Sequence, residues 1–185
     1  MSETVHQNAT YEDVLALPEQ LVGEIIGGVL HTRHRPAPRH ARAYSALGYR
    51  LGGPFDGGIG GPGGWWIIDE PELHVSGDIL VPDIAGWRRE RMPKLPESAW
   101  FELAPDWVCE ILSPSSRIHD RSVKLPCYAS NGVAHLWLVD PDAKTLEVYE
   151  LQGEHWLLLI TLHDDQGVRQ PPFDAIEFPL DSLWA

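Results

Sequence analysis

Two acidic residues lie in apolar segments, where a carboxylate is costly without a partner. Asp83 comes directly after a proline in an apolar run, and Glu110 lies inside the apolar run 107–112. Alternate side chains of a strand point to opposite faces, so Glu110 shares its face with two aliphatic neighbours. A carboxylate in such a place must be protonated, paired or bound to a metal.

Two carboxylates on neighbouring strands could together hold a hard divalent cation such as magnesium, which prefers oxygen ligands and keeps several waters. Such an ion lowers the pKa of a bound water and neutralises the charge that develops on a phosphate. Lys124, in a segment expected to be helical and directly after the Glu110 strand, could orient the water or the phosphate. Such a pattern is compatible with metal-dependent hydrolysis of a phosphodiester.

Each of these residues also has a structural interpretation. Asp83 could end a strand in a turn after proline, and Glu110 could be a buried partner of an arginine. Lys124 could pair at the surface with Asp120, four residues earlier in the chain. Pro126 removes a hydrogen bond from the helical segment and could kink it.

The surrounding pattern predicts a mixture of helices and strands around a central sheet, an α/β or α+β class. Thr10 begins a short helix that ends before Pro18, and 21–33 is expected to form a hairpin or bent strand pair around two glycines. Alanine and leucine at four-residue spacing predict an amphipathic helix over 40–51. The glycine-rich stretch 52–64 predicts a loop, with either a flexible lid or a disordered surface loop left open. The further expected strands are 65–68, 73–75, 79–87, 107–112, 133–139, 146–151 and 155–162, with a helical segment at 120–130 and a turn at 140–144.

Length and composition predict one domain spanning residues 1–185, with its core at about 11–165. The first ten residues are polar and no apolar run could span a bilayer, so neither export nor membrane insertion is expected and the cytoplasm is the default. The two cysteines, Cys109 and Cys127, match no paired zinc motif and are expected in the core.

The charge distribution is compatible with a protein surface that binds nucleic acid. The net charge of −13 argues against a protein that coats DNA. However, five arginines and no acidic residue lie between Ile25 and Phe55, and basic residues gather again at 86–94. A positive face on an acidic body is therefore feasible, and scattered solvated arginines are the alternative.

The order and spacing of several short motifs resemble the PD-(D/E)XK nuclease superfamily, and more closely its bacterial Uma-type restriction endonuclease family. The resemblance covers about Tyr11 to Asp140. The motifs are Gly23-Glu24-Ile25-Ile26-Gly27-Gly28, His40 opening a helix, Val81-Pro82-Asp83, Glu110-Ile111-Leu112-Ser113-Pro114-Ser115, Asp120 with Lys124 and Tyr128, Gly132-Val133, and Trp137-Leu138-Val139-Asp140-Pro141.

The resemblance implies a restriction-endonuclease-like central mixed sheet flanked by helices, and a Mg- or Mn-dependent endonuclease acting on DNA. It implies metal ligation by Asp83, Glu110 and the backbone carbonyl of Ile111, an accessory acidic role for Glu24, and the catalytic-lysine role for Lys124. Glu72 competes with Glu24 for the accessory role. A homodimer is expected by analogy with nucleases that address both strands.

The superfamily's lysine normally follows the strand carboxylate by two residues, and here Leu112 holds that position. The resemblance implies that the lysine comes from the following helix instead. The alternative is a catalytically inactive protein that keeps the fold and acts as a DNA- or protein-binding module. The acidic net charge and the leucine favour this alternative, and divalent-metal titration would discriminate between the two.

Overall fold

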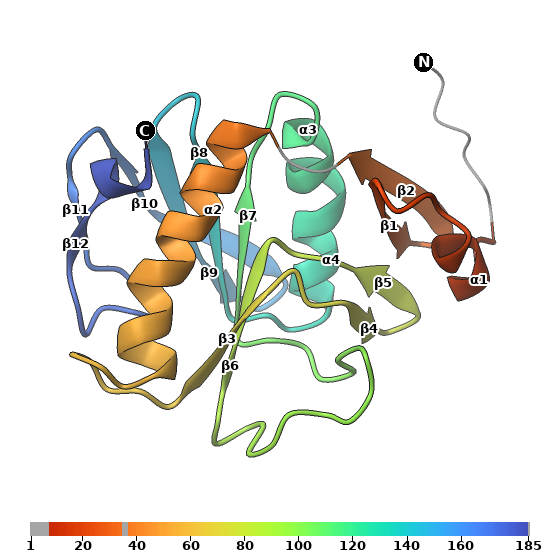
Figure 1. Ribbon diagram of the computed structural model, residues 1–185, viewed down its shortest axis with the longest axis horizontal. Coiled ribbons are helices and arrows are strands. Elements are labelled where there is room, and N and C mark those ends of the chain that lie inside the picture. The colour runs from red at the N-terminus through yellow and green to blue at the C-terminus, as the bar shows by residue number, and fades with distance from the viewer. Residues whose placement is uncertain (1–7, 35–36, 185) are drawn as a thin grey trace.

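The computed structural model describes residues 8–34 and 37–184, and its centre is a six-stranded sheet (Figure 1). The strand order is β10-β9-β8-β7-β6-β3, in which β7 and β8 run parallel and the other neighbours antiparallel. This is the mixed sheet that the sequence predicted. The strands are β3 Trp65–Asp69, β6 Ile84–Arg88, β7 Trp107–Ile111, β8 His135–Asp140, β9 Thr145–Gln152 and β10 His155–His163.

A smaller sheet stands beside the large one, on the right of Figure 1. Its strands, in the order β2-β1-β5-β4, are β1 Leu21–Ile26, β2 Val29–His34, β4 Leu73–Val75 and β5 Asp78–Leu80. The predicted hairpin is present as β1 and β2, and its turn uses Gly27 and Gly28 at positive φ, which suits glycine. The short helix α1, Tyr11–Leu15, precedes it with Thr10 in a capping box, as expected.

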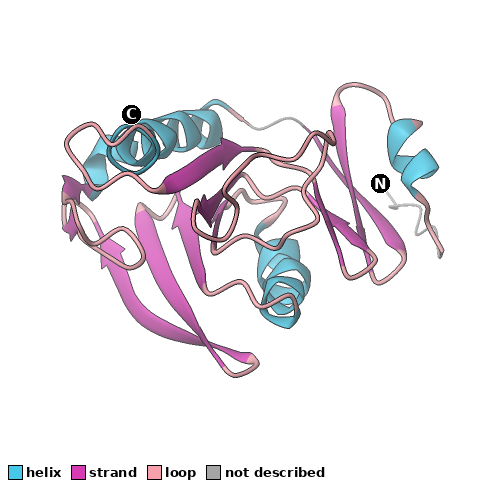
Figure 2. Ribbon diagram, turned by 90° about the horizontal axis from the view of Figure 1, so that it is seen from below, coloured by secondary structure: helices cyan, strands magenta, loops and turns pink. Residues whose placement is uncertain are grey.

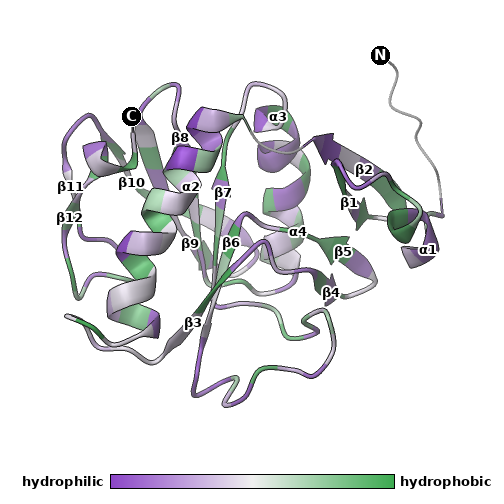
Figure 3. Cartoon of the chain, in the orientation of Figure 1, coloured by the Kyte–Doolittle hydropathy of each residue, from purple (hydrophilic) through white to green (hydrophobic). Residues whose placement is uncertain are grey.

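Two helical segments cover opposite faces of the large sheet (Figure 2). The amphipathic helix α2, Pro38–Leu51, packs on one face, and apolar and polar residues alternate along it (Figure 3). The second segment comprises α3 Arg117–His119, the π-helical turn η2 Asp120–Lys124, and α4 Leu125–Ser130. Along β7, Trp107, Cys109 and Ile111 face the α2 side, while Val108 faces the α4 side. Glu110 therefore belongs to the α4 face.

The π-helical turn η2 explains how the helical segment accommodates Pro126. Pro126 lies in the first turn of α4, where the missing N–H is tolerated, because the wider turn η2 ends just before it. The segment therefore continues past the proline, and both Lys124 and Tyr128 are buried in it.

Two predicted boundaries were wrong. The run 79–87 is two strands in different sheets, β5 and β6, because Pro82 cannot donate a ladder hydrogen bond and the chain leaves the small sheet there. The glycine-rich stretch begins as a π-helical turn, η1 Gly52–Asp56, that extends α2. Phe55 anchors this turn by packing against Phe173, with ring centroids 4.7 Å apart.

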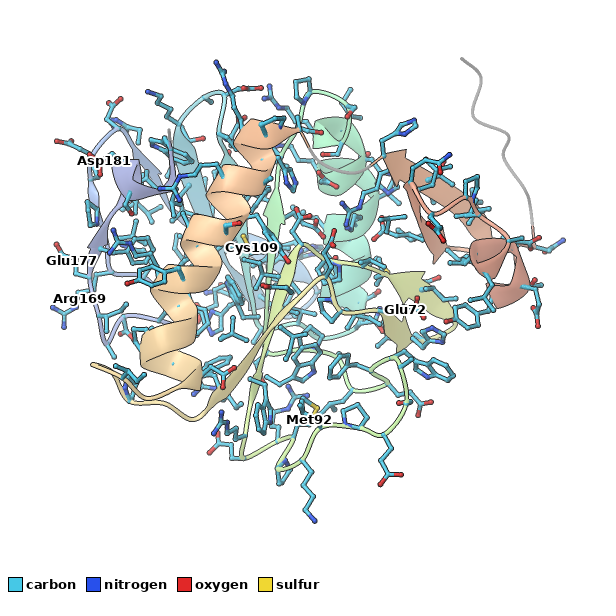
Figure 4. The ribbon with its side chains drawn as sticks, viewed as in Figure 1. Glu72, Met92, Cys109, Arg169, Glu177 and Asp181 are labelled. Atoms are coloured by element: carbon cyan, nitrogen blue, oxygen red, sulfur yellow. The ribbon has the colours of Figure 1, made fainter. Side chains whose placement is uncertain are left out.

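The C-terminal part adds β11 Gly167–Val168, β12 Phe178–Pro179 and the 3-10 helix η3 Leu180–Leu183, which the sequence did not predict. Both cysteines are free and buried, as expected, and Figure 4 shows Cys109 beneath α2. Over residues 8–34 and 37–184, none of the helices combines the length and the apolar character needed to cross a membrane.

Candidate active site

Strand register brings Asp83 and Glu110 side by side at one end of the large sheet. Ile84 of β6 pairs with Cys109 of β7, so the next position of this antiparallel register places Asp83, just before β6, beside Glu110. The backbone N–H of Ile111 donates to Oδ2 of Asp83 at 2.7 Å. Asp83 and Glu110 are 3% and 2% exposed, so both carboxylates lie in the interior.

Lys124 reaches the same place from the helical segment on this face. Its Nζ lies 2.7 Å from Oε1 of Glu110 and 2.9 Å from Oε1 of Glu24, and it donates to the Val81 carbonyl at 3.2 Å. Lys124 is buried between these carboxylates rather than paired at the surface beside Asp120. The ammonium group therefore contacts one of the two central carboxylates directly.

Tyr128 comes one turn after Lys124 and points to the same carboxylate. Its hydroxyl donates to Oε1 of Glu110 at 2.5 Å. Lys124 and Tyr128 both contact Glu110 through this oxygen. The helical segment thus fixes the orientation of the Glu110 side chain.

Glu24 enters the cluster from β1 of the small sheet. Its Oε1 accepts a hydrogen bond from the backbone N–H of Val81 at 2.7 Å, in addition to the contact with Lys124. Glu72, which competed with Glu24 in the sequence, lies instead beside the short strands of the small sheet (Figure 4) and bonds His74 at 2.8 Å. The structure therefore brings Glu24, and not Glu72, to Lys124.

Asp83 is held by two further side chains that come from distant parts of the chain. His40, in the first turn of α2, lies with Nε2 3.1 Å from Oδ2 of Asp83. Arg33, at the end of the first hairpin, lies with Nη1 3.5 Å from Oδ1 and donates to the Val81 carbonyl at 3.3 Å. The arginine contact is longer than a good charge-assisted hydrogen bond, so it is a loose pair.

The surroundings drive the pKa values of the two central carboxyls in opposite directions. Burial raises the pKa of Asp83, but the hydrogen bond to His40 and the charges of His40 and Arg33 outweigh it and lower the pKa below its usual value. Burial raises the pKa of Glu110 to about 8, against the opposing charge of Lys124. Two carboxyl groups whose pKa values are shifted in opposite directions are typical of sites that carry out acid–base or metal chemistry.

Lys124 remains a cation in this environment. Burial alone lowers its pKa, but the carboxylates of Glu110 and Glu24 more than compensate, so the pKa rises above its usual value. Asp120, in the same helical segment, is buried as well, and its burial raises its own pKa.

The buried acidic side chains of this cluster outnumber its cations. The acidic ones are Glu24, Asp83, Glu110 and Asp120, and the facing cations are Lys124, Arg33 and, when protonated, His40. Because burial raises the pKa of Glu110 to about 8, a bound divalent cation would stabilise the charged form of this carboxyl. Across the described residues, no three His, Cys, Asp or Glu side chains are grouped closely enough to hold a metal by themselves. Two carboxylates with a backbone carbonyl and waters fit magnesium, which uses few protein ligands.

A protein-family model identifies the family of the chain. The model of the Uma2 family, described as "Putative restriction endonuclease", matches residues 11–181. The chain belongs to the Uma2 family. This confirms the resemblance seen in the sequence, and family membership supports a nuclease with a nucleic-acid substrate.

Solved structures agree on the fold of this Uma2 chain. It is similar to the crystal structure of a putative nuclease belonging to DUF820 from Anabaena variabilis, with a TM-score of 0.71 and 23% sequence identity. The alignment covers 95% of this chain and 97% of that one, which confirms the predicted fold class. Curated proteins give no match.

Sequence reasoning predicted no contact with the carboxylates for three residues that the Uma2 fold brings to them. They are Arg33, His40 and Tyr128. Only Tyr128 carried a local signal, since it follows Lys124 by four residues and so shares its helix face. Arg33 is one of the five arginines between Ile25 and Phe55 that made a positive face feasible, and it is instead partly buried against Asp83.

The second basic stretch, 86–94, is largely occupied by contacts within the protein. Arg89 pairs with Asp56 at 2.5 Å and Arg91 with Asp106 at 2.8 Å. These arginines hold the loop that follows β6. On α2, by contrast, Arg39 and Arg42 are exposed.

Proposed function

We propose that this Uma2 protein is a Mg²⁺- or Mn²⁺-dependent endonuclease that hydrolyses phosphodiester bonds in DNA. Asp83, Glu110 and the backbone carbonyl of Ile111 would hold the metal. The observation that carries the proposal is the buried cluster in which Asp83 and Glu110 lie side by side with Lys124 between Glu110 and Glu24. A bound divalent ion would supply an activated water and neutralise charge on the phosphate.

The chain's own residues position this chemistry. His40 and the N–H of Ile111 fix the Asp83 carboxylate and favour its charged form. Tyr128 and Lys124 together hold one oxygen of Glu110. Lys124 places a permanent positive charge next to Glu110, where it can orient an attacking water or a phosphate oxygen. Glu24 fulfils the accessory role by holding Lys124 in position.

One observation favours the catalytically inactive alternative. The Lys124 side chain is only 1% exposed and is fully engaged with two carboxylates, so the cluster could serve as a buried ion-pair network that stabilises a DNA- or protein-binding module. Such a module would have no need of a metal.

Metal titration distinguishes the two functions. We expect Mg²⁺ or Mn²⁺ to raise the melting temperature, and a metal present at a hundredfold over its Kd stabilises by about 2.7 kcal/mol. The same ions should convert supercoiled plasmid to nicked or linear DNA, and EDTA should stop the reaction. The absence of both effects would support the metal-free binding module, and stabilisation without cleavage of DNA would also contradict the proposed nuclease.

The proposal extends to a homodimer, for which the edge strand β10 offers a surface. Four consecutive aliphatic residues, Leu157 to Ile160, are 37–47% exposed, and β10 forms one edge of the large sheet. An exposed apolar edge strand without charged side chains is prone to pair with another chain, and a second copy brings an equivalent edge.

Leu158→Lys should therefore shift the protein from dimer to monomer, because it places a charge in the apolar edge. Sedimentation equilibrium measures the change. Leu95→Lys is the matched control, since Leu95 is 45% exposed in a loop, against 47% for Leu158. A wild-type protein that sediments as a monomer would refute the dimer and leave the nuclease proposal intact.

A further inference from the structure

A pocket of about 460 Å³ opens next to the carboxylate cluster. It lies where the first turn of α2 meets the chain that follows the parallel strands β7 and β8. Pro38, Arg39, His40, Leu112, Pro114 and Pro141 are among the residues that line it. Ligands of α/β proteins favour this location, outside the carboxyl ends of parallel strands.

Two of these residues connect the pocket directly to the cluster. Leu112 comes two residues after Glu110, and His40 contacts Asp83 through Nε2. The other ring nitrogen of His40, Nδ1, is buried and has no hydrogen-bond partner within the described residues. His40 lines the pocket and is only 7% exposed, so this buried polar atom lies without a partner in the pocket wall.

The mouth of the pocket suits an anion. Helix α2 is 14 residues long, its N-cap residue Ala37 offers no capping side chain, and its first turn contains no acidic residue. The free N–H groups and the positive end of the helix dipole therefore lie at the pocket, and no acidic side chain of the first turn neutralises them. The side chain of Arg39 is 79% exposed at the same place.

The rest of the lining is apolar and suits a sugar and a base. The prolines and Leu112 supply rigid aliphatic surface, and the volume falls within the range of small-ligand pockets. One acidic residue opposes an anion, because Asp142 pairs with Arg39 at 3.3 Å. That pair is solvent-exposed on both sides and therefore weak, so a phosphate can replace Asp142 as the partner of Arg39.

We propose that this pocket binds one nucleotide of the substrate strand, next to the phosphodiester at the carboxylates. The phosphate of that nucleotide lies at the start of α2 with Arg39, and its sugar and base lie against the proline and leucine surface. This inference rests on the proposed function, since it specifies how the same site would hold its substrate.

Calorimetry on the metal-free protein in EDTA tests the pocket without requiring cleavage. Thymidine 5′-monophosphate should bind at least tenfold more tightly than either thymidine or inorganic phosphate, because only the nucleotide fills both parts of the pocket. Arg39→Gln should weaken nucleotide binding by about tenfold, as expected for one charge-assisted hydrogen bond. Asp142→Asn should strengthen it, since the opposing carboxylate is gone.

Arg42→Gln is the matched control, because Arg42 is an exposed arginine of the same helix that bonds the Ser182 carbonyl away from the pocket. Its nucleotide affinity should equal that of the wild type. Equal affinity for phosphate and nucleotide, equal affinity for thymidine and nucleotide, no binding of the nucleotide, or an unchanged affinity in Arg39→Gln would each overturn the proposal. A failure of metal-dependent cleavage leaves this binding result unaffected, so the two proposals can fail separately.

Discussion

Lys124→Met should destabilise the metal-free protein by about 3–5 kcal/mol, the usual cost of removing one partner from a buried ion pair. Lys124 is almost completely buried, and its Nζ contacts both Glu110 and Glu24. Methionine has a similar shape but leaves Glu24 and Glu110 without their cation, so Glu110, whose pKa burial already raises to about 8, must take up a proton or stay as an unpaired buried charge. Chemical denaturation with urea, evaluated by linear extrapolation, measures the loss.

Two comparisons separate this electrostatic effect from a general loss of packing. Adding Glu110→Gln and Glu24→Gln to Lys124→Met should restore most of the lost stability, because the uncompensated charges disappear with the lysine. Lys94→Met, at an exposed lysine, should change stability by no more than about 0.5 kcal/mol. If Lys124→Met cost no more than Lys94→Met, the buried ion-pair cluster would not exist as described.

Asp83→Asn and Glu110→Gln should each reduce metal-dependent DNA cleavage by roughly a thousandfold, since metal catalysis contributes several kcal/mol of transition-state stabilisation. Both substitutions keep the shape of the side chain and remove its charge. The metal-dependent rise in melting temperature should be lost together with cleavage. Plasmid cleavage and thermal unfolding on the same preparations measure both effects.

Stability in the absence of metal provides the internal check. Glu110→Gln removes a carboxylate whose burial raises its pKa to about 8, and Lys124 keeps Glu24 as its partner, so the metal-free variant should remain folded. Glu72→Gln is the control, because Glu72 bonds His74 outside the cluster. Wild-type cleavage rates in both Asp83→Asn and Glu110→Gln would exclude these residues as metal ligands.

The sequence was most informative where a local pattern determines local structure. Because side chains alternate between the two faces of a strand, the run 107–112 predicted which neighbours share a face with Glu110. The structure has this strand as β7, with Glu110 on the α4 face. Two adjacent glycines predicted the first hairpin, and four-residue spacing predicted α2. The family and the fold class followed from motifs in a fixed order.

Local sequence patterns did not predict the contacts between segments that are far apart in the chain. His40 contacts Asp83, which lies 43 residues later in the chain. The position of His40 at the start of a helix does not indicate this partner. The run 79–87 reads as one strand because its apolar character is continuous, whereas Pro82 divides it between two sheets. Pairing partners and sheet assignment depend on tertiary packing, which periodicity does not encode.

Some expectations stay predictions. These are the single-domain boundary of 1–185 with its core at about 11–165, the metal-ligand roles of Asp83, Glu110 and Ile111, and the catalytic roles of Lys124 and Glu24. The geometry supports these site roles by bringing the side chains together at the end of β7.

A crystal structure of the protein soaked in Mn²⁺ tests the central claim most directly, because the anomalous signal of manganese locates the ion independently of any assumed ligand. The account predicts a peak bound by carboxylate oxygens of Asp83 and Glu110 and by the carbonyl of Ile111, with Lys124 still beside Glu110. A fully occupied manganese elsewhere, with the Asp83 and Glu110 carboxylates still engaged only by His40, Arg33, Lys124 and Tyr128, would contradict it.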